Sequence, residues 1–523
     1  MRGPFPPPIM EPVRIQYSRE RFVKAVICLN VTEMIVFIVY LLFMIGIGVF
    51  FFLRSRGAGE KEYFLGGRKM GPWVSALSAG ASDMSAWVLM GLPASIYAQG
   101  LGQIWIAVGL AIGYALSWIF EAPRLRAFSL AADDSITIPQ YLTNRFKSKS
   151  HALQVVCAVI FLVAYTIYAA SSIKAAGTLF HTVLGIDATV AMYIAAAIII
   201  LYTFLGGFSA VCWTDFFQGM LMLGALLLAP IFAAANLPAN SGVDTPGYYT
   251  VFTSWNDVLS GLAWGLGYFG MPHIIIRFMS VESQKSLKRS AKIGITWTTL
   301  ILIFAVAVGV LGRMYLGFDA EIASKELVFI TMVRRLFPAL FSGILLSAIL
   351  AAAMSTADSQ LLSAASAFSS DVYKPVLRKN KTTDNEMLWT GRIVVLVIAL
   401  LALILASNPN AGSIMALVSN AWGVFGAAFG PAILLSLFWK RFTFKGAIAG
   451  ISVGALVDIA WLIIHGRMTA ANASYSGIFT LYEILPGFVC GLIAAISVTL
   501  LDKAPAKEVE DLFDRAVAAK DAD

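Results

Sequence analysis

The chain has 523 residues, of which 59% are hydrophobic and 13% are charged, and its mean hydropathy is +0.79. Soluble domains contain about 45–50% apolar and about 25% charged residues. This composition excludes a soluble enzyme, a disulfide scaffold, a disordered chain and a nucleic-acid binder. A membrane helix with its loop takes roughly 35–40 residues, so the length predicts about a dozen spans. The net charge of +8 indicates basic residues gathered on one side of a bilayer.

Residues 1–31 differ from the rest of the chain. Prolines at positions 4, 6, 7, 8 and 12 preclude a helix at the start, and Arg14, Arg19, Arg21 and Lys24 make the stretch basic. It lacks the apolar core and the cleavage site of a signal peptide. We interpret it as a flexible tail, and the alternative is that translation starts at Met34, directly before the first span.

Apolar segments of spanning length then follow in regular order up to residue 502. Several exceed the roughly 20 residues that a span needs, which is typical of tilted or broken helices. A charged, Ala-rich tail with an amphipathic pattern follows at 503–523, and we expect it in the cytoplasm. The sequence predicts thirteen spans, at about 32–53, 72–98, 102–123, 152–180, 187–206, 211–235, 256–279, 290–315, 338–368, 389–407, 412–438, 443–464 and 480–502.

The loops between these segments alternate in charge. Lys and Arg gather after the first, third, seventh, ninth and eleventh spans, whereas loops 236–255, 408–411 and 465–479 carry very little positive charge. Loop 316–337 is mixed. The positive-inside rule then predicts that odd-numbered spans exit into the cytoplasm, with the N-terminus outside and the C-terminus inside. A basic tail outside works against that rule, which favours the start at Met34.

Two spans are not uniformly apolar. The second contains SALSAGASDMSAW at 75–87, and the seventh contains WGLGYFGMPH at 264–273. Gly and Pro weaken helices, and backbone groups freed at membrane depth must find partners or line a cavity. Each break begins a consecutive group of five helices, a pattern typical of inverted-repeat transporters. The alternative is ordinary helix packing, because Gly and Pro are common in membrane helices.

The polar residues at membrane depth indicate a site for a small hard cation. Asp83 lies in the first break, where a carboxylate costs roughly 2.5–3.5 kcal/mol to insert and normally faces a cavity or a partner. Hydroxyls and carbonyls in the ninth span are hard oxygen ligands. The alternatives are a structural ion pair for Asp83 and hydroxyls bonded back to their own helix. The ninth-span residues are Ser347, Ser355, Thr356, Asp358 and Ser359.

Other polar residues have plainer interpretations. Asp215 at a span end can cap a helix or handle an ion, and Asp458 is interpreted as a packing or interface residue. His273 follows the second break, and a lone imidazole more often bonds backbone than metal. The four cysteines show no metal or redox spacing. No catalytic nucleophile with a base, no HExxH and no phosphate loop is present, so the sequence predicts no enzyme.

Four motifs carry a family resemblance. LGGRKMGPWVSALSAGASDMSAWVLMGLP, TFLGGFSAVCWTD, WGLGYFGMPHIIIRFM and ILLSAILAAAMSTADSQLL resemble the sodium:solute symporter family, and most closely its bacterial sodium/proline symporters. The resemblance runs from about residue 34 to about residue 505. It implies an all-α membrane protein with about thirteen helices, a five-plus-five inverted repeat of the leucine-transporter type and an extracellular N-terminus.

The resemblance also implies roles for particular residues. Sodium, the co-transported ion, would be bound by the carbonyls of Ala81, Met84 and Ala352 and the hydroxyls of Ser355 and Thr356. Asp83 matches a carboxylate required for sodium coupling, Arg68 matches a basic residue important for coupling, and Asp215 with Ser359 matches a second ion position in some relatives. The residues that match the proline pocket are Ser85, Tyr168, Trp264, Tyr268 and Pro272.

Two residues depart from the family pattern. Ala86 stands where proline carriers commonly have glycine, and Met271 where glutamine is frequent, so the preference among small amino acids is in doubt. The expected function is sodium-coupled uptake of L-proline across a bacterial cytoplasmic membrane. The expected partners are the solute, sodium and the lipid bilayer, without nucleic acid or an obligate protein partner. The alternatives are a symporter for pantothenate, a sugar or a short carboxylate, and a transporter-like membrane sensor.

Overall fold

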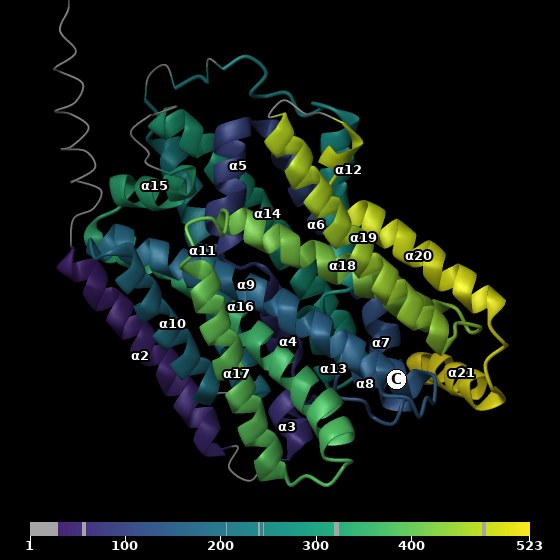
Figure 1. Ribbon diagram of the computed structural model, residues 1–523. Helices are drawn as coiled ribbons and strands as arrows, with labels where there is room; N and C mark the ends of the chain where they lie inside the picture. Colours follow the sequence, from purple (N-terminus) through teal and green to yellow (C-terminus); the bar gives the residue numbers. More distant parts are fainter. Residues whose placement is uncertain are drawn as a thin grey trace, which may run out of the picture.

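The fold is a bundle of helices (Figure 1). The computed structural model describes residues 30–54, 59–205, 207–238, 241–243, 245–317, 324–472 and 477–522. Within these ranges there is no β-strand, and one isolated parallel bridge joins Met70 to Val281. The predicted N-terminal tail falls outside the described residues except for its last two positions, so it stays a prediction.

Each of the thirteen predicted segments is helical. Two of the thirteen, the second and the seventh, are broken, and several helices extend beyond the predicted limits. The unbroken long helices are α2 Val31–Arg54, α9 Ala152–Leu184, α10 Ala188–Leu205, α11 Phe208–Ala235, α14 Gln284–Leu316, α16 Ala339–Phe368, α17 Asp384–Ala406, α18 Ile414–Phe438, α19 Phe444–Ala471 and α20 Ile484–Leu501.

Shorter helices connect or extend these. The third segment runs through η3 Leu101–Gln103, α6 Ile104–Leu116, η4 Ser117–Glu121 and α7 Ala122–Ala131, and α16 continues into η7 Ser369–Leu377. The helices outside the predicted spans are α3 Glu60–Leu65, η1 Gly66–Arg68, α8 Ile138–Arg145, η6 Lys325–Leu327, α15 Val328–Leu336, η8 Ile478–Thr480 and α21 Lys507–Ala522.

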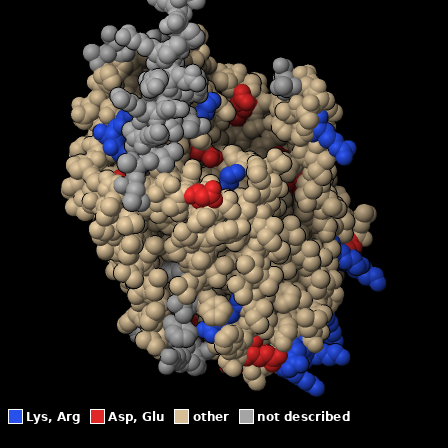
Figure 2. Space-filling model, turned by 60° about the vertical axis from the view of Figure 1, so that its left-hand side comes forward, with Lys and Arg blue, Asp and Glu red and all other residues tan. Residues whose placement is uncertain are grey.

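Length and composition make the bundle a membrane domain. Among the described residues, ten helices are long and apolar enough to cross a bilayer, and a bent pair brings the number to eleven. Figure 2 shows a broad uncharged surface, with Lys, Arg, Asp and Glu gathered mainly toward the two ends. Helices α16 and α18 are largely buried, whereas α2 and α17 leave many large apolar side chains exposed, as lipid-facing helices do.

The predicted break in the second segment is confirmed. Helix α4 (Pro72–Asp83) ends at Asp83, and the chain resumes as the π-helix η2 (Trp87–Gly91) and α5 (Leu92–Gln99). At Met84 the backbone leaves helical geometry, with φ −76° and ψ 65°. The Ser85 N–H therefore donates to the Asp83 carbonyl at 2.8 Å rather than to the Ala81 carbonyl one turn back. The break thus releases a buried carbonyl at membrane depth.

The predicted break in the seventh segment is also confirmed. Helix α12 (Trp255–Ala263) continues as the 3₁₀ helix η5 (Trp264–Phe269), and α13 (Pro272–Ser280) leaves at a bend of 44°. Two glycines here also serve helix packing: a Cβ at Gly265 would lie 2.3 Å from the Gly109 carbonyl oxygen, and one at Gly267 would meet the Trp422 ring. Close approach of α6 and α18 therefore requires glycine at both positions.

The C-terminal tail folds onto the bundle. Its amphipathic helix α21 packs against α7, with Leu512 and Ala516 fully buried and the Phe513 ring 5.1 Å from that of Phe128. Arg145 of α8 donates to the Val509 carbonyl at 3.2 Å. Residues 507–522 therefore form part of the same folded unit (Figure 1).

Candidate functional site

The predicted ion-site residues come from α4 and α16, which meet at the first break. The Ser355 hydroxyl lies 2.8 Å from the released Ala81 carbonyl and 3.2 Å from the Ala352 carbonyl of its own helix. Ala81, Ala352 and Ser355 thus form one hydrogen-bonded group, fully buried at membrane depth. Met84, whose carbonyl is the fourth predicted ligand, is the residue at which the helix ends.

The hydroxyl of Thr356, next to Ser355 on α16, is a further candidate ligand for an ion. It is buried and has no hydrogen-bond partner among the described residues. A helical threonine normally satisfies its hydroxyl by bonding back to its own helix, as Ser347 does to the Gly343 carbonyl at 2.8 Å. The back-bonding interpretation therefore holds for Ser347 and fails for Thr356. An unpaired buried hydroxyl costs roughly 1–3 kcal/mol, which a bound cation would offset.

Asp83 connects the two breaks. The Tyr268 hydroxyl of η5 donates to Asp83 Oδ2 at 2.5 Å, and Asp83 Oδ1 has no hydrogen-bond partner in the described part of the chain. The Asp83 carbonyl also accepts a long bond from Trp87 Nε1 at 3.4 Å. Within the described residues no basic side chain pairs with Asp83, so the alternative of a structural ion pair finds no support. The carboxylate therefore lies at a direct contact between the two broken helices.

Aromatic rings pack around this contact. The Trp264 ring lies 6.0 Å from Trp87 and 5.0 Å from Tyr482, and the Tyr268 ring lies 5.0 Å from Tyr114. Trp422 of α18 joins both, because its ring lies 5.1 Å from Tyr268 and its Nε1 donates to the Trp264 carbonyl at 2.8 Å. Sequence reasoning found Trp264 and Tyr268 but missed Trp87, Trp422, Tyr114 and Tyr482.

The other predicted substrate residues belong to the two breaks and to α9. Ser85 belongs to the first break, and Pro272 begins α13 at a first-turn position that suits proline. Tyr168 of α9 is fully buried, with its ring 6.1 Å from that of His273. The departures from the family pattern border both breaks: Ala86 precedes η2, and Met271 precedes α13.

Trp264 also borders a separate cavity. This cavity of about 320 Å³ is bordered by residues of α12, α18 and α19 and by the segment before α20. Its polar lining includes Asp257, Asn420, His465 and Glu483, and Trp264 belongs to its wall. We call this cavity the vestibule. Trp264 lies between the vestibule and the buried Tyr268–Asp83 contact.

The predicted second ion position holds a guanidinium. Arg277 Nη2 of α13 donates to Asp215 Oδ2 at 3.0 Å and to the Ser359 hydroxyl at 2.6 Å. Its Nε donates to Ser78 at 2.9 Å, and Ser78 donates to Asp215 at 2.7 Å. Asp215 and Ser359 do come together, around Arg277. Sequence reasoning missed Arg277, although an arginine inside the apolar run IIIRFM was a signal.

Arg68 joins three segments at the opposite end of the molecule from the vestibule. Its guanidinium donates to Asp134 at 2.8 Å, to the Met279 carbonyl at 2.6 Å and to the Ser135 carbonyl at 2.8 Å. A fourth bond reaches Ser129 at 3.1 Å. Burial lowers the pKa of Arg68, and the Asp134 carboxylate offsets part of that shift, but an arginine remains charged.

Arg126, which sequence reasoning missed, adds to the contacts that Arg68 makes between these segments. It donates to the carbonyls of Val281 and Glu282 at 2.9 and 2.8 Å, directly after α13. The bridge between Met70 and Val281 adds two backbone bonds, of 3.1 and 3.2 Å. Loop 66–71, the end of α7 and the end of α13 are therefore fastened together, and we call this group of contacts the arginine clasp.

Replacing Arg68 with lysine is expected to lower the maximal uptake rate by about tenfold or more, because lysine keeps the charge but cannot reach four acceptors, and each lost bond is worth roughly 1 kcal/mol. Initial-rate kinetics should show a smaller change in KM than in kcat. Arg124→Lys is the matched control, since Arg124 makes a single carbonyl bond, to Leu437 at 2.8 Å. Uptake by Arg68→Lys at the parental rate would show that charge alone suffices.

Comparison with known sequences places the chain among transporters. A model of the sodium:solute symporter family matches residues 63–454. The osmoregulated proline transporter OpuE of Bacillus subtilis is 43% identical over 484 residues, covering 91% of this chain and 96% of that protein. The high-affinity proline transporter PutP of the same organism is 42% identical over 88% of this chain and 97% of its own length. A sodium/proline symporter of Staphylococcus aureus is 42% identical over 90% of this chain and 93% of that protein.

Solved structures share the fold. A Na⁺-coupled sialic acid symporter, in a substrate-bound outward-open state, superposes with a TM-score of 0.74 at 22% identity, over 91% of this chain and 99% of that one. MHP1, a nucleobase-cation-symport-1 family transporter, gives a TM-score of 0.52 at 13% identity, over 86% of this chain and 97% of that one. At these identities the likeness concerns architecture alone.

Proposed function

The chain belongs to the sodium:solute symporter family, and we propose that it couples inward movement of sodium to uptake of L-proline. The observation that carries this proposal is the junction of the two broken helices, where Tyr268 bonds Asp83, two residues after the released Ala81 carbonyl. The proposed sodium ligands and a cluster of aromatic rings adjoin there. Relatives more than 40% identical along most of the chain are named as proline transporters.

Sodium is the co-transported ion. The proposed ligands are the carbonyls of Ala81, Met84 and Ala352 and the hydroxyls of Ser355 and Thr356. All five are neutral oxygens, which suit a hard monovalent cation. The unpartnered Thr356 hydroxyl and the turn of Ser355 toward Ala81 support this assignment. A bound ion would bridge α4 to α16 and hold the first break in one shape.

The proposed substrate pocket uses Ser85, Tyr168, Trp264, Tyr268 and Pro272, together with Trp87 and Trp422. Proline presents a carboxylate, a secondary ammonium and a compact apolar ring. Aromatic faces can enclose the ring and attract the cation, and the exposed start of a half-helix such as α13 can take the carboxylate. Ala86 and Met271 border this space and are the positions at which preference among small amino acids would be set.

We propose thirteen spans, with the N-terminus outside and the C-terminus inside a bacterial cytoplasmic membrane. Ten helices and the bent α12–α13 pair are long and apolar enough to cross. The broken α4–α5 segment and α10 would supply the remaining two. The distribution of Lys and Arg supports this orientation, because it puts the arginine clasp on the cytoplasmic side and the vestibule outside.

The second proposed ion position, at Asp215 and Ser359, is a weaker candidate in this conformation. Arg277 already supplies a positive charge to both residues, so an ion could enter only after the guanidinium moves. Coupling through the first position alone is sufficient energetically. A potential of 100 mV contributes about 2.3 kcal/mol per charge and a tenfold sodium gradient about 1.4, which together support accumulation of roughly a few hundredfold.

Alternating access would then proceed by rocking of the helices that carry the breaks. Solute enters from the vestibule past Trp264 while the arginine clasp keeps the cytoplasmic side closed. Sodium bound between α4 and α16 stabilises the first break, and the Asp83–Tyr268 bond conveys that shape to the second. Release to the cytoplasm requires Arg68 and Arg126 to give up the carbonyls at the end of α13.

Replacing Asp83 with asparagine is expected to raise the sodium concentration for half-maximal uptake by about tenfold, because the charge-assisted bond from Tyr268 is lost. Tyr268→Phe should shift it in the same direction. The measurement is proline uptake at a series of sodium concentrations. Tyr193→Phe on the lipid-exposed side of α10 is the control, since Tyr193 is 53% exposed. An unchanged sodium requirement in Asp83→Asn would reduce Asp83 to a structural residue.

A competition experiment tests the choice of solute. Labelled proline uptake in proteoliposomes should be inhibited by excess unlabelled L-proline and unaffected by pantothenate, sugars or short carboxylates. Sodium-dependent uptake of one of those solutes that proline fails to inhibit would favour a sister symporter. A soluble partner that binds only in the presence of sodium and solute would favour a membrane sensor instead.

A further inference from the structure

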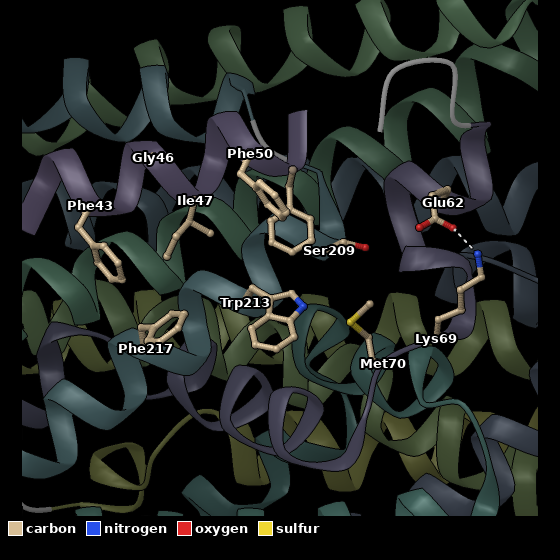
Figure 3. Close-up of a pocket in the computed structure, with 11 residues that line it drawn as sticks. Phe43, Gly46, Ile47, Phe50, Glu62, Lys69, Met70, Ser209, Trp213 and Phe217 are labelled. Atoms are coloured by element: carbon tan, nitrogen blue, oxygen red, sulfur yellow. Dashed lines mark hydrogen bonds and ion pairs between the residues drawn. The ribbon is translucent and has the colours of Figure 1, made fainter. Parts of the chain in front are cut away.

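A large cavity lies between α2 and α11, and none of the residues that line it belongs to the proposed sodium or proline site. Its volume is about 1060 Å³, and Figure 3 shows the residues around it. The α2 residues that line it recur at helical spacing, and so do Ser209, Trp213 and Phe217 of α11. The cavity therefore runs along one face of each helix. The α2 residues are Phe43, Gly46, Ile47, Phe50 and Phe51.

Aromatic contacts join the two helices on either side of the cavity, and Gln218 Nε2 also donates to the Tyr40 hydroxyl at 3.2 Å. The Phe43 and Phe217 rings lie 5.5 Å apart, and the Phe51 and Trp213 rings lie 6.5 Å apart. Gly46 lies between these contacts, and a Cβ at this position would have nothing within 4 Å. The cavity therefore combines an apolar, aromatic wall with room for a hydrocarbon chain.

The cavity opens toward the bilayer. Phe50 is 57% exposed, and other large apolar side chains of α2, such as Val39 and Leu42, are also exposed. Water is absent from the hydrocarbon core of a membrane, so an apolar cavity at this depth is open to acyl chains. The structure thus provides a groove of the shape and polarity of a lipid tail.

One end of the cavity is polar. Glu62 and Lys69, from the segment between α2 and α4, lie there beside Ser209 at the start of α11 (Figure 3). Lys69 Nζ and Glu62 Oε2 are 3.4 Å apart, and their side chains are 75% and 35% exposed. Hydrophobic wall and charged rim together match an amphiphile, with its head at the membrane surface and its tail along α2.

The rim carries one charge of each sign. A phosphate would pair with the Lys69 ammonium, while a primary ammonium on the same headgroup would donate hydrogen bonds to the Glu62 carboxylate. A net anionic headgroup would meet the Glu62 charge unpaired, and a quaternary choline has no N–H to donate. We propose that this cavity is a binding site for phosphatidylethanolamine, in the leaflet at the end of the molecule that carries the arginine clasp.

The bound lipid would touch the segment that closes the transport path. Met70 lines the cavity through its side chain, and its backbone forms the bridge to Val281 in the arginine clasp. Arg68, two residues earlier, makes its own hydrogen bonds in the clasp, to Asp134, Ser129 and the carbonyls of Met279 and Ser135. Lipid binding would therefore stabilise loop 66–71 against α2 and α11.

Native mass spectrometry of the detergent-purified chain tests the tail pocket. Dioleoyl phosphatidylethanolamine is titrated against the parent, Gly46→Phe, and Gly224→Phe as a matched control, because a Cβ at Gly224 also has nothing within 4 Å and Gly224 does not line the cavity. Filling the cavity should weaken the first lipid adduct at least tenfold, as loss of about two buried methylenes would. Equal binding by parent and Gly46→Phe would overturn the proposal.

Glu62→Gln tests the headgroup, with dioleoyl phosphatidylcholine and dioleoyl phosphatidylglycerol as comparison lipids. The parent should bind the ethanolamine lipid about fivefold more tightly than the choline lipid, a typical value for an exposed ion pair, and Glu62→Gln should lose this preference. Tighter binding of the glycerol lipid than of the ethanolamine lipid by the parent would contradict the assignment. So would a parent that forms a dimer instead of lipid adducts, if Gly46→Phe abolishes that dimer.

Discussion

Replacing Thr356 with valine is expected to raise the sodium concentration for half-maximal uptake by roughly ten- to a hundredfold, since one charge-assisted oxygen contact is worth about 1.5–3 kcal/mol. Valine keeps the shape of threonine and removes only the hydroxyl. That hydroxyl has no hydrogen-bond partner among the described residues, so the sodium-free protein should be as stable as the parent or slightly more stable. Uptake kinetics and thermal unfolding with and without sodium measure both effects.

A higher sodium requirement together with unchanged stability in the absence of sodium distinguishes a sodium ligand from a structural residue. At the same sodium concentration, sodium should raise the melting temperature of the parent more than that of Thr356→Val, because the stabilisation by a bound ion falls as its Kd rises. Ser347→Ala, two turns earlier on α16, is the matched control, since the Ser347 hydroxyl bonds its own helix. A parental sodium response in Thr356→Val would remove Thr356 from the proposed site.

Replacing Arg277 with glutamine is expected to destabilise the protein by about 3–5 kcal/mol, because a buried carboxylate loses its charged partner. Arg277 and Asp215 are almost completely buried, with 1% and 0% of their side chains exposed. Ser78 and Ser359 would also lose their donor. Thermal unfolding in detergent should show a large drop in melting temperature, and uptake should fall with the amount of folded protein.

The double variant Asp215→Asn/Arg277→Gln separates the charge from the packing. Removing both charges leaves neutral side chains of similar size, so a large part of the lost stability should return. Asp215→Asn alone should be destabilising, because it leaves the guanidinium unpaired. A double variant as unstable as the sum of the two singles would contradict direct pairing as the source of the stability.

Much of the architecture follows from the sequence because a bilayer imposes simple rules. Apolar length gave thirteen helical segments, and each of them is helical in the structure. The lapses in hydropathy at 75–87 and 264–273 correspond to the two breaks, since Gly, Pro and polar residues persist at membrane depth only where backbone bonds are rearranged. Asp83 drew attention for the same reason, as an ionisable residue that hydrocarbon penalises.

The contacts between distant segments could not be predicted from the chain alone. Tyr268 meets Asp83 across 185 positions, and Trp422 reaches η5 from α18. An aromatic residue in an apolar run carries no signal that separates a pocket wall from lipid-facing surface. Arg277 was visible as a charge but not as the partner of Asp215, because that pairing depends on the bend between α12 and α13.

The central claim is that an inward sodium gradient drives uptake of proline. It is tested most directly in proteoliposomes that contain the purified chain, with labelled L-proline outside and sodium imposed outside only. We predict accumulation above the external concentration, which disappears when choline replaces sodium or when an ionophore dissipates the gradient. Proline accumulation that persists without sodium would contradict the coupling.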